Sequence, residues 1–124
     1  MPNLTLDNND SSYQIRSFKP GVIQVNEKTY TRSIIISPHS LIENWPPQTI
    51  AELKADTLSL VISMKPTILL IGTGSKLVFP AVEIYGALIN AGIGVELMDT
   101  AAACRTYNAL SAENRNVAAA LIVK

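Results

Sequence analysis

Two short segments carry the residue types that could bind a ligand or support catalysis. Gly72-Thr73-Gly74 follows the apolar run 67–71, and glycines let backbone N–H groups approach an anion closely. The spacing fits neither the dinucleotide-binding pattern nor the P-loop, because Leu77 stands where a third glycine belongs and Lys76 is misplaced. The turn is therefore interpreted as either an anion-binding loop or a tight strand exit that requires glycine.

The second segment runs from Asp99 to Asn108. Thr100, Cys104 and Asn108 recur every four residues and share one helical face, while Arg105 is offset by one position. Arg105 could pair with Asp99 or face a ligand. A small-molecule or anion site between this segment and the glycine turn would use these candidate ligand-binding residues: Gly72, Thr73, Gly74, Asp99, Thr100, Cys104, Arg105, Tyr107 and Asn108.

Each candidate also has a structural interpretation. A helix start and a nearby arginine would lower the pKa of Cys104, but a thiol nucleophile usually needs a base, and the sole histidine, His39, lies in a distant loop. Cys104 is otherwise a small buried residue, Asp99 a helix N-cap and Tyr107 a core or groove residue. We predict no catalytic residues, no metal site and no cofactor, so an enzyme is the less favoured interpretation.

Hydrophobic periodicity predicts the elements that position these segments. The N-terminal third is predicted to be a β-meander with strands at 14–18, 22–25 and 29–37. Residues 37–49 then form an ordered, proline-containing connection, in which Trp45 is either a packing plug or a hot spot for a partner.

The remaining chain reads as a helix followed by a β-α-β-α-β unit. Thr49 and Glu52 form a capping box for a helix that ends before Pro66. Strands at 67–71, 93–98 and 117–123 alternate with helices at 81–90 and from 99 or 100 to 114, which implies parallel pairing. We therefore predict a compact three-layer α/β domain around a mixed sheet, spanning 13–124 after a flexible segment 1–12.

Composition limits the possible partners. Ten Lys and Arg balance ten Asp and Glu, so electrostatics favours neither nucleic acid nor an anionic membrane. One cysteine excludes an internal disulfide and multi-cysteine metal clusters. The absence of a long apolar run argues against membrane insertion, and an N-terminus without signal or transit features predicts a cytoplasmic location. The small, neutral and apolar chain is compatible with a homo-oligomer.

The two motifs together resemble a known family. Gly72-Thr73-Gly74 and the run 99–108 are similar to motifs of a small single-domain family that includes a mitochondrial respiratory complex I assembly factor and an adipogenesis-associated protein. Ser37-Pro38, Trp45-Pro46 and the closing run 118–121 also fit, so the resemblance extends from about Gln14 to Val123.

This resemblance implies a compact β/α domain with a mixed sheet and no established activity or cofactor. It also suggests a link with biogenesis of inner-membrane proteins. We therefore expect a non-enzymatic accessory protein that binds a protein partner, with a small-molecule or anion-binding domain as the alternative. A thiol enzyme that uses Cys104 is the least favoured hypothesis.

Overall fold

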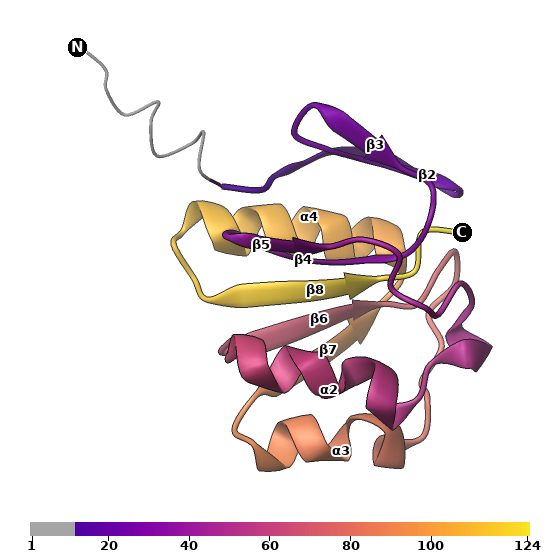
Figure 1. Cartoon of the computed structure of the whole chain (residues 1–124), viewed down its shortest axis with the longest axis vertical. Helices are drawn as coiled ribbons and strands as arrows, with labels where there is room; N and C mark the ends of the chain where they lie inside the picture. The colour runs from indigo at the N-terminus through magenta and orange to yellow at the C-terminus, as the bar shows by residue number, and fades with distance from the viewer. Residues whose placement is uncertain (1–11) are drawn as a thin grey trace.

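The computed structural model describes residues 12–124, so the predicted flexible segment lies, apart from Ser12, outside the described residues. Two sheets form the framework (Figure 1). The smaller is antiparallel, in the order β1 (Ile15–Lys19), β2 (Val22–Val25) and β3 (Lys28–Tyr30). It corresponds to the first part of the predicted meander. Its strands pair antiparallel because their connections are too short for parallel crossovers.

The larger sheet has the strand order β5-β4-β8-β6-β7. Its strands are β4 (Ile34–Ser37), β5 (Ser40–Ile42), β6 (Ile68–Gly72), β7 (Gly94–Met98) and β8 (Val117–Leu121). β6 pairs in parallel with both β7 and β8, whereas β4 pairs antiparallel to β8 and β5. The predicted mixed sheet is confirmed, and its parallel strands all end at one edge.

Helices cover both faces of this sheet. α2 (Ala55–Met64) and α3 (Val82–Asn90) lie on one face, where Leu58, Val61 and Leu88 join a buried apolar core. α4 (Thr100–Ala112) covers the other face together with the small sheet (Figure 1). The predicted three-layer α/β domain is therefore confirmed. No helix within residues 12–124 has the length and apolar character needed to cross a bilayer.

The predicted single strand at 29–37 is wrong. β3 and β4 belong to different sheets, and the chain crosses between them at Ser33, which is fully buried. The Ser33 carbonyl accepts the Trp45 N–H at 2.9 Å, and its hydroxyl accepts the Val123 N–H at 3.4 Å. These contacts fix a break that β propensity alone could not indicate.

The connection 37–49 contains β5, a strand that the sequence analysis missed. The prediction that Trp45 anchors this segment is confirmed, because its side chain is buried and its Nε1–H donates to the Thr57 carbonyl at 2.7 Å. The buried indole therefore acts as the plug rather than as an exposed hot spot.

The predicted capping box at Thr49 is also wrong. The Glu52 carboxylate accepts the Gln48 N–H at 2.7 Å, and residues 50–52 form a single 3-10 turn, η1 (Ile50–Glu52). α2 instead begins after Lys54, whose N–H donates to Thr57 Oγ1 at 3.1 Å.

Candidate functional site

The ends of β6 and β7 meet as the sequence analysis predicted, because these strands are adjacent and parallel. The Thr73 N–H donates to the Met98 carbonyl, and the Thr100 N–H donates to the Gly74 carbonyl, both at 2.9 Å. We call this region, where β6, β7 and β8 end, the carboxyl edge. It brings Gly72, Thr73, Gly74, Asp99 and Thr100 together.

Thr100 is the centre of the carboxyl edge. Its hydroxyl is fully buried, donates to the Ile122 carbonyl at 2.7 Å and accepts the Gly74 N–H at 2.9 Å. One side chain thus joins the segments that follow β6 and β8 to the first turn of α4.

Gly72 is required here by close packing. A Cβ atom on this residue would lie 2.9 Å from Thr100 Oγ1 and 3.0 Å from both Thr100 Cα and Leu121 Cδ2. Gly74 has a φ of +104°, a backbone conformation that favours glycine. The N–H groups of Thr73 and Gly74 both have internal acceptors.

Thr73 shapes the loop that leaves the edge. Its buried hydroxyl donates to the Lys76 carbonyl and accepts the Val78 N–H at 3.2 Å. Asp99 caps α4, since its Oδ1 accepts the Ala102 N–H at 2.9 Å. The Thr73 hydroxyl therefore fixes the backbone of the loop after β6, and the Asp99 carboxylate fixes the first turn of α4.

Tyr107 and Asn108 lie farther along α4 and contact the N-terminal part of the chain instead. The buried Tyr107 hydroxyl donates to the Tyr13 carbonyl at 2.7 Å, and burial raises the pKa of that phenol. The Asn108 amide accepts the Ile15 N–H at 3.0 Å and donates to the Ile15 carbonyl at 2.7 Å. These two residues hold β1 against α4.

Cys104 and Arg105 differ in exposure although they are neighbours. Cys104 is 5% exposed, and burial raises its pKa to about 12. The charge of Arg105 lowers this pKa by a smaller amount, and the charge of Asp99 raises it. The thiol is therefore protonated at neutral pH, which makes it a weak nucleophile. The Arg105 side chain is exposed.

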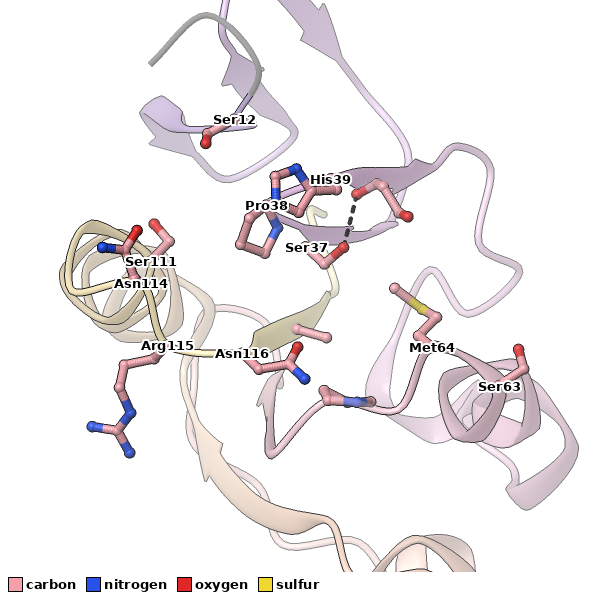
Figure 2. Close-up of a pocket in the computed structure, with 13 residues that line it drawn as sticks. Ser12, Ser37, Pro38, His39, Ser63, Met64, Ser111, Asn114, Arg115 and Asn116 are labelled. Carbon is pink, nitrogen blue, oxygen red and sulfur yellow. Dashed lines mark hydrogen bonds between the residues drawn. The ribbon is translucent and has the colours of Figure 1, made fainter. Parts of the chain in front are cut away.

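Sequence reasoning missed a polar hollow that lies at the opposite edge of the sheet. This polar hollow has a volume of about 740 Å³ and is enclosed by the β4–β5 turn, the end of α2 and the end of α4 (Figure 2). Its polar lining includes His39, Ser40, Asn114 and Asn116, and none of the described residues that line it is a carboxylate. In Figure 2 Arg115 points away from the other labelled side chains. Its residues are scattered along the sequence, so no motif marks it.

An exposed apolar patch next to the carboxyl edge was also missed. Leu77, Val78 and Phe79 lie in the loop after β6, and Val82 begins α3. Phe79 is 72% exposed, Val82 56% and Leu77 49%. The run Leu77-Val78-Phe79-Pro80 was the available signal, since three apolar residues directly before a proline are unlikely to form a buried strand. We call these four residues, 77–79 and 82, the apolar patch.

Groups of His, Cys, Asp and Glu that could hold a metal ion are absent from residues 12–124. What the carboxyl edge offers chemically is thus a set of satisfied hydrogen bonds. Besides the polar hollow, the exposed features described above are the apolar patch and the charged side chain of Arg105.

Known proteins resemble this chain over most of its length. The 13 kDa major membrane protein of Francisella tularensis subsp. holarctica is 34% identical over 108 residues, which cover 86% of this chain and 88% of that protein. NADH dehydrogenase (ubiquinone) 1 alpha subcomplex assembly factor 3 of Danio rerio is 34% identical over 110 residues. That match covers 87% of this chain and 63% of the zebrafish protein, so the chain spans less than two thirds of this relative.

The fold is also known from experiment in similar proteins. The crystal structure of a Bordetella parapertussis protein superposes with a TM-score of 0.86 at 35% identity, covering 92% of this chain and 98% of that one. The family model described as protein of unknown function (DUF498/DUF598) matches residues 15–122. Since that match takes in both sheets, all the helices described above and both motifs, this chain belongs to the DUF498/DUF598 family, as the resemblance predicted.

Proposed function

We propose that this chain is a non-enzymatic accessory protein that binds another protein during the assembly or biogenesis of membrane protein complexes. The observation that carries the proposal is the apolar patch, whose most exposed residue, Phe79, is 72% exposed. Contiguous exposed apolar side chains on a small domain mark interaction surfaces, and large aromatic side chains are frequent binding hot spots. Relatives named as assembly factors of NADH dehydrogenase support the same role.

The carboxyl edge supports this proposal because it holds the patch in place. The Thr73 hydroxyl bonds the backbone at Lys76 and Val78, on either side of Leu77. A loop fixed in this way presents its apolar side chains with less loss of conformational entropy on binding. In this account, the glycine turn and Thr73 build the surface that a protein partner recognises. We further propose that this interaction takes place in the cytoplasm.

A complementation experiment tests the proposal. Deletion of the gene in its host should reduce the amount of at least one assembled membrane complex on native gels, and the wild-type chain should restore it. Phe79→Ser should fail to restore assembly, while Val22→Ser, at an exposed apolar position on β2, should succeed. Normal assembly in the deletion strain, or full rescue by Phe79→Ser, contradicts the proposal.

A second candidate function is small-molecule binding, which the polar hollow favours over the originally predicted position at the carboxyl edge. Its volume of about 740 Å³ lies within the range of roughly 300–1,000 Å³ that is typical of ligand pockets. Native mass spectrometry of protein purified gently from its host should then show a retained small molecule. The His39→Ala and Asn114→Gly variants should lose that mass. An unliganded mass throughout contradicts this second function.

A further inference from the structure

A smaller hollow lies between β1 and the first half of α4, away from both surfaces discussed above. Its volume is about 230 Å³. The polar side chains that line it belong to Arg16, Ser17, Arg105 and Asn108, and Phe18 contributes an apolar wall. Among residues 12–124, Arg16 and Arg105 carry its formal charges and no carboxylate lines it. We call it the arginine hollow.

Local structure explains why two arginines share this hollow. Asn108 holds the backbone of Ile15 through two hydrogen bonds, which fixes β1 on α4. Directly after Ile15 the register with β2 shifts, so Arg16 is the extra residue of a β-bulge. Bulges redirect side chains, and Arg105 lies one helical turn before Asn108. The clamp and the bulge therefore bring Arg16 and Arg105 to the same hollow from two elements.

The two arginines of this hollow carry the same charge. Within the part of the chain that the structure describes, neither guanidinium has an ion pair or a hydrogen bond, and both side chains are exposed. Two like charges at one hollow repel each other, and that repulsion is relieved when an anion binds between them. Guanidinium groups are also suited to phosphate, because their planar N–H donors match its oxygen atoms in pairs.

We propose that the arginine hollow binds a phosphate group, carried either by a soluble small molecule or by a lipid headgroup. The small volume favours one such group over a whole cofactor, because pockets that enclose larger ligands begin at roughly 300 Å³. Arg16 and Arg105 neutralise the charge, and the Ser17 hydroxyl provides a further donor. This site is independent of the proposed protein-binding function, which uses the apolar patch.

The site is tested with inorganic pyrophosphate and the full chain. Titration at low salt, followed by amide NMR shifts, should produce saturable changes at residues 16–18 and 101–105, while sodium chloride at equal ionic strength should not. Arg16→Gln and Arg105→Gln should each weaken binding roughly tenfold, because hydrogen bonds to charged groups are the strong ones. Arg32→Gln is the matched control, since this exposed arginine lies between β3 and β4 and lines neither the arginine hollow nor the polar hollow.

A parallel measurement distinguishes the two sources of phosphate. Sedimentation with phosphatidylglycerol vesicles, compared with phosphatidylcholine vesicles, tests the headgroup, whereas pyrophosphate tests a soluble ligand. Binding in either assay that the Arg16→Gln/Arg105→Gln double variant loses supports the site and names its source. Absence of binding in both assays, or binding that the folded double variant retains, overturns the proposal.

Discussion

The two edges of the five-stranded sheet differ in how their polar groups are used. At the carboxyl edge the Thr100 hydroxyl, the Thr73 hydroxyl and the Asp99 carboxylate all bond backbone groups nearby. At the opposite edge, the polar hollow of about 740 Å³ is lined by His39, Asn114 and other polar side chains. The edge with the recognisable motif is therefore closed, whereas the edge without a motif is open.

A specific sequence motif therefore need not mark a binding site. Residues such as Gly72 and Thr100 are specified by close packing and by hydrogen bonds, which constrain residue type as strongly as catalysis does. Under the proposed function their contribution is indirect, since they hold the loop that carries the apolar patch. Substitutions that disturb the fold should lower stability, whereas substitutions in the apolar patch should not.

Thr100→Val should have the largest effect. It leaves the Gly74 N–H and the Ile122 carbonyl buried without partners, which should lower the free energy of unfolding by about 3 kcal/mol. Urea denaturation measures the change. Thr100→Ser retains the hydroxyl and should lose less than about 1 kcal/mol. Equal stability of the two variants would show that these hydrogen bonds do not hold the edge together.

Asn108→Leu should have the next largest effect, about 2 kcal/mol, because both hydrogen bonds to the Ile15 backbone are lost. The damage should be local, so hydrogen exchange should accelerate in β1 and β2 more than in β6 and β8. Asn108→Asp, which can still accept the Ile15 N–H but cannot donate while ionised, should give an intermediate result. Uniform acceleration throughout the chain would contradict the role of Asn108 as a clamp for β1.

The buried thiol predicts a loss of stability at alkaline pH. The pKa of Cys104 rises on folding from 9.0 to about 12, so its stabilising contribution is complete below pH 9 and is lost as pH rises towards 12. The loss should be on the order of 1 kcal/mol at pH 10. The stability of Cys104→Ala should fall less steeply over this range. If the free energy of unfolding fell equally steeply with pH in this variant and in the wild type, the thiol would not be buried as described.

Thiol reactivity compares the buried face of α4 with the polar hollow. Native Cys104 should react with iodoacetamide at pH 8 far more slowly than after unfolding in urea. A cysteine introduced into the polar hollow, as Ser40→Cys on a Cys104→Ala background, should react at a rate close to that of the unfolded chain, because Ser40 is exposed. Rapid alkylation of native Cys104 would indicate an accessible thiol and reopen the enzymatic hypothesis.

Phe79→Ser should have the smallest effect on stability, below about 0.5 kcal/mol, because the side chain is 72% exposed. Its unfolding midpoint in urea should match that of the wild type even though partner binding is lost. A large destabilisation would mean that Phe79 packs against the domain and is not free to bind a partner.

The parallel part of the larger sheet was predictable because its signals are local. The apolar run 67–71 and the helix signals at Pro80, Gly92 and Asp99 were sufficient for the parallel unit. The break at Ser33 and the short strand β5 were not predictable, since both depend on contacts with β8 and Trp45 that are distant in sequence.

The meeting of the two motifs was predictable, but the hydrogen-bond partners of their residues were not. The adjacency of β6 and β7 brings the two motifs together, as parallel connectivity indicates. That the Thr100 hydroxyl reaches the Ile122 carbonyl depends on β8, which lies far along the chain. The arginine hollow depends on a β-bulge at Arg16, which no local pattern revealed.

In-cell photo-crosslinking tests whether the carboxyl edge builds the fold while the apolar patch binds a protein. Phe79 and, in a separate variant, Val22 would be replaced by p-benzoylphenylalanine in the host. The account predicts a discrete protein adduct from position 79, none from position 22, and loss of the adduct when Thr73→Val releases the loop while the domain stays folded. Equal crosslinking at both positions, or none at 79, would contradict it.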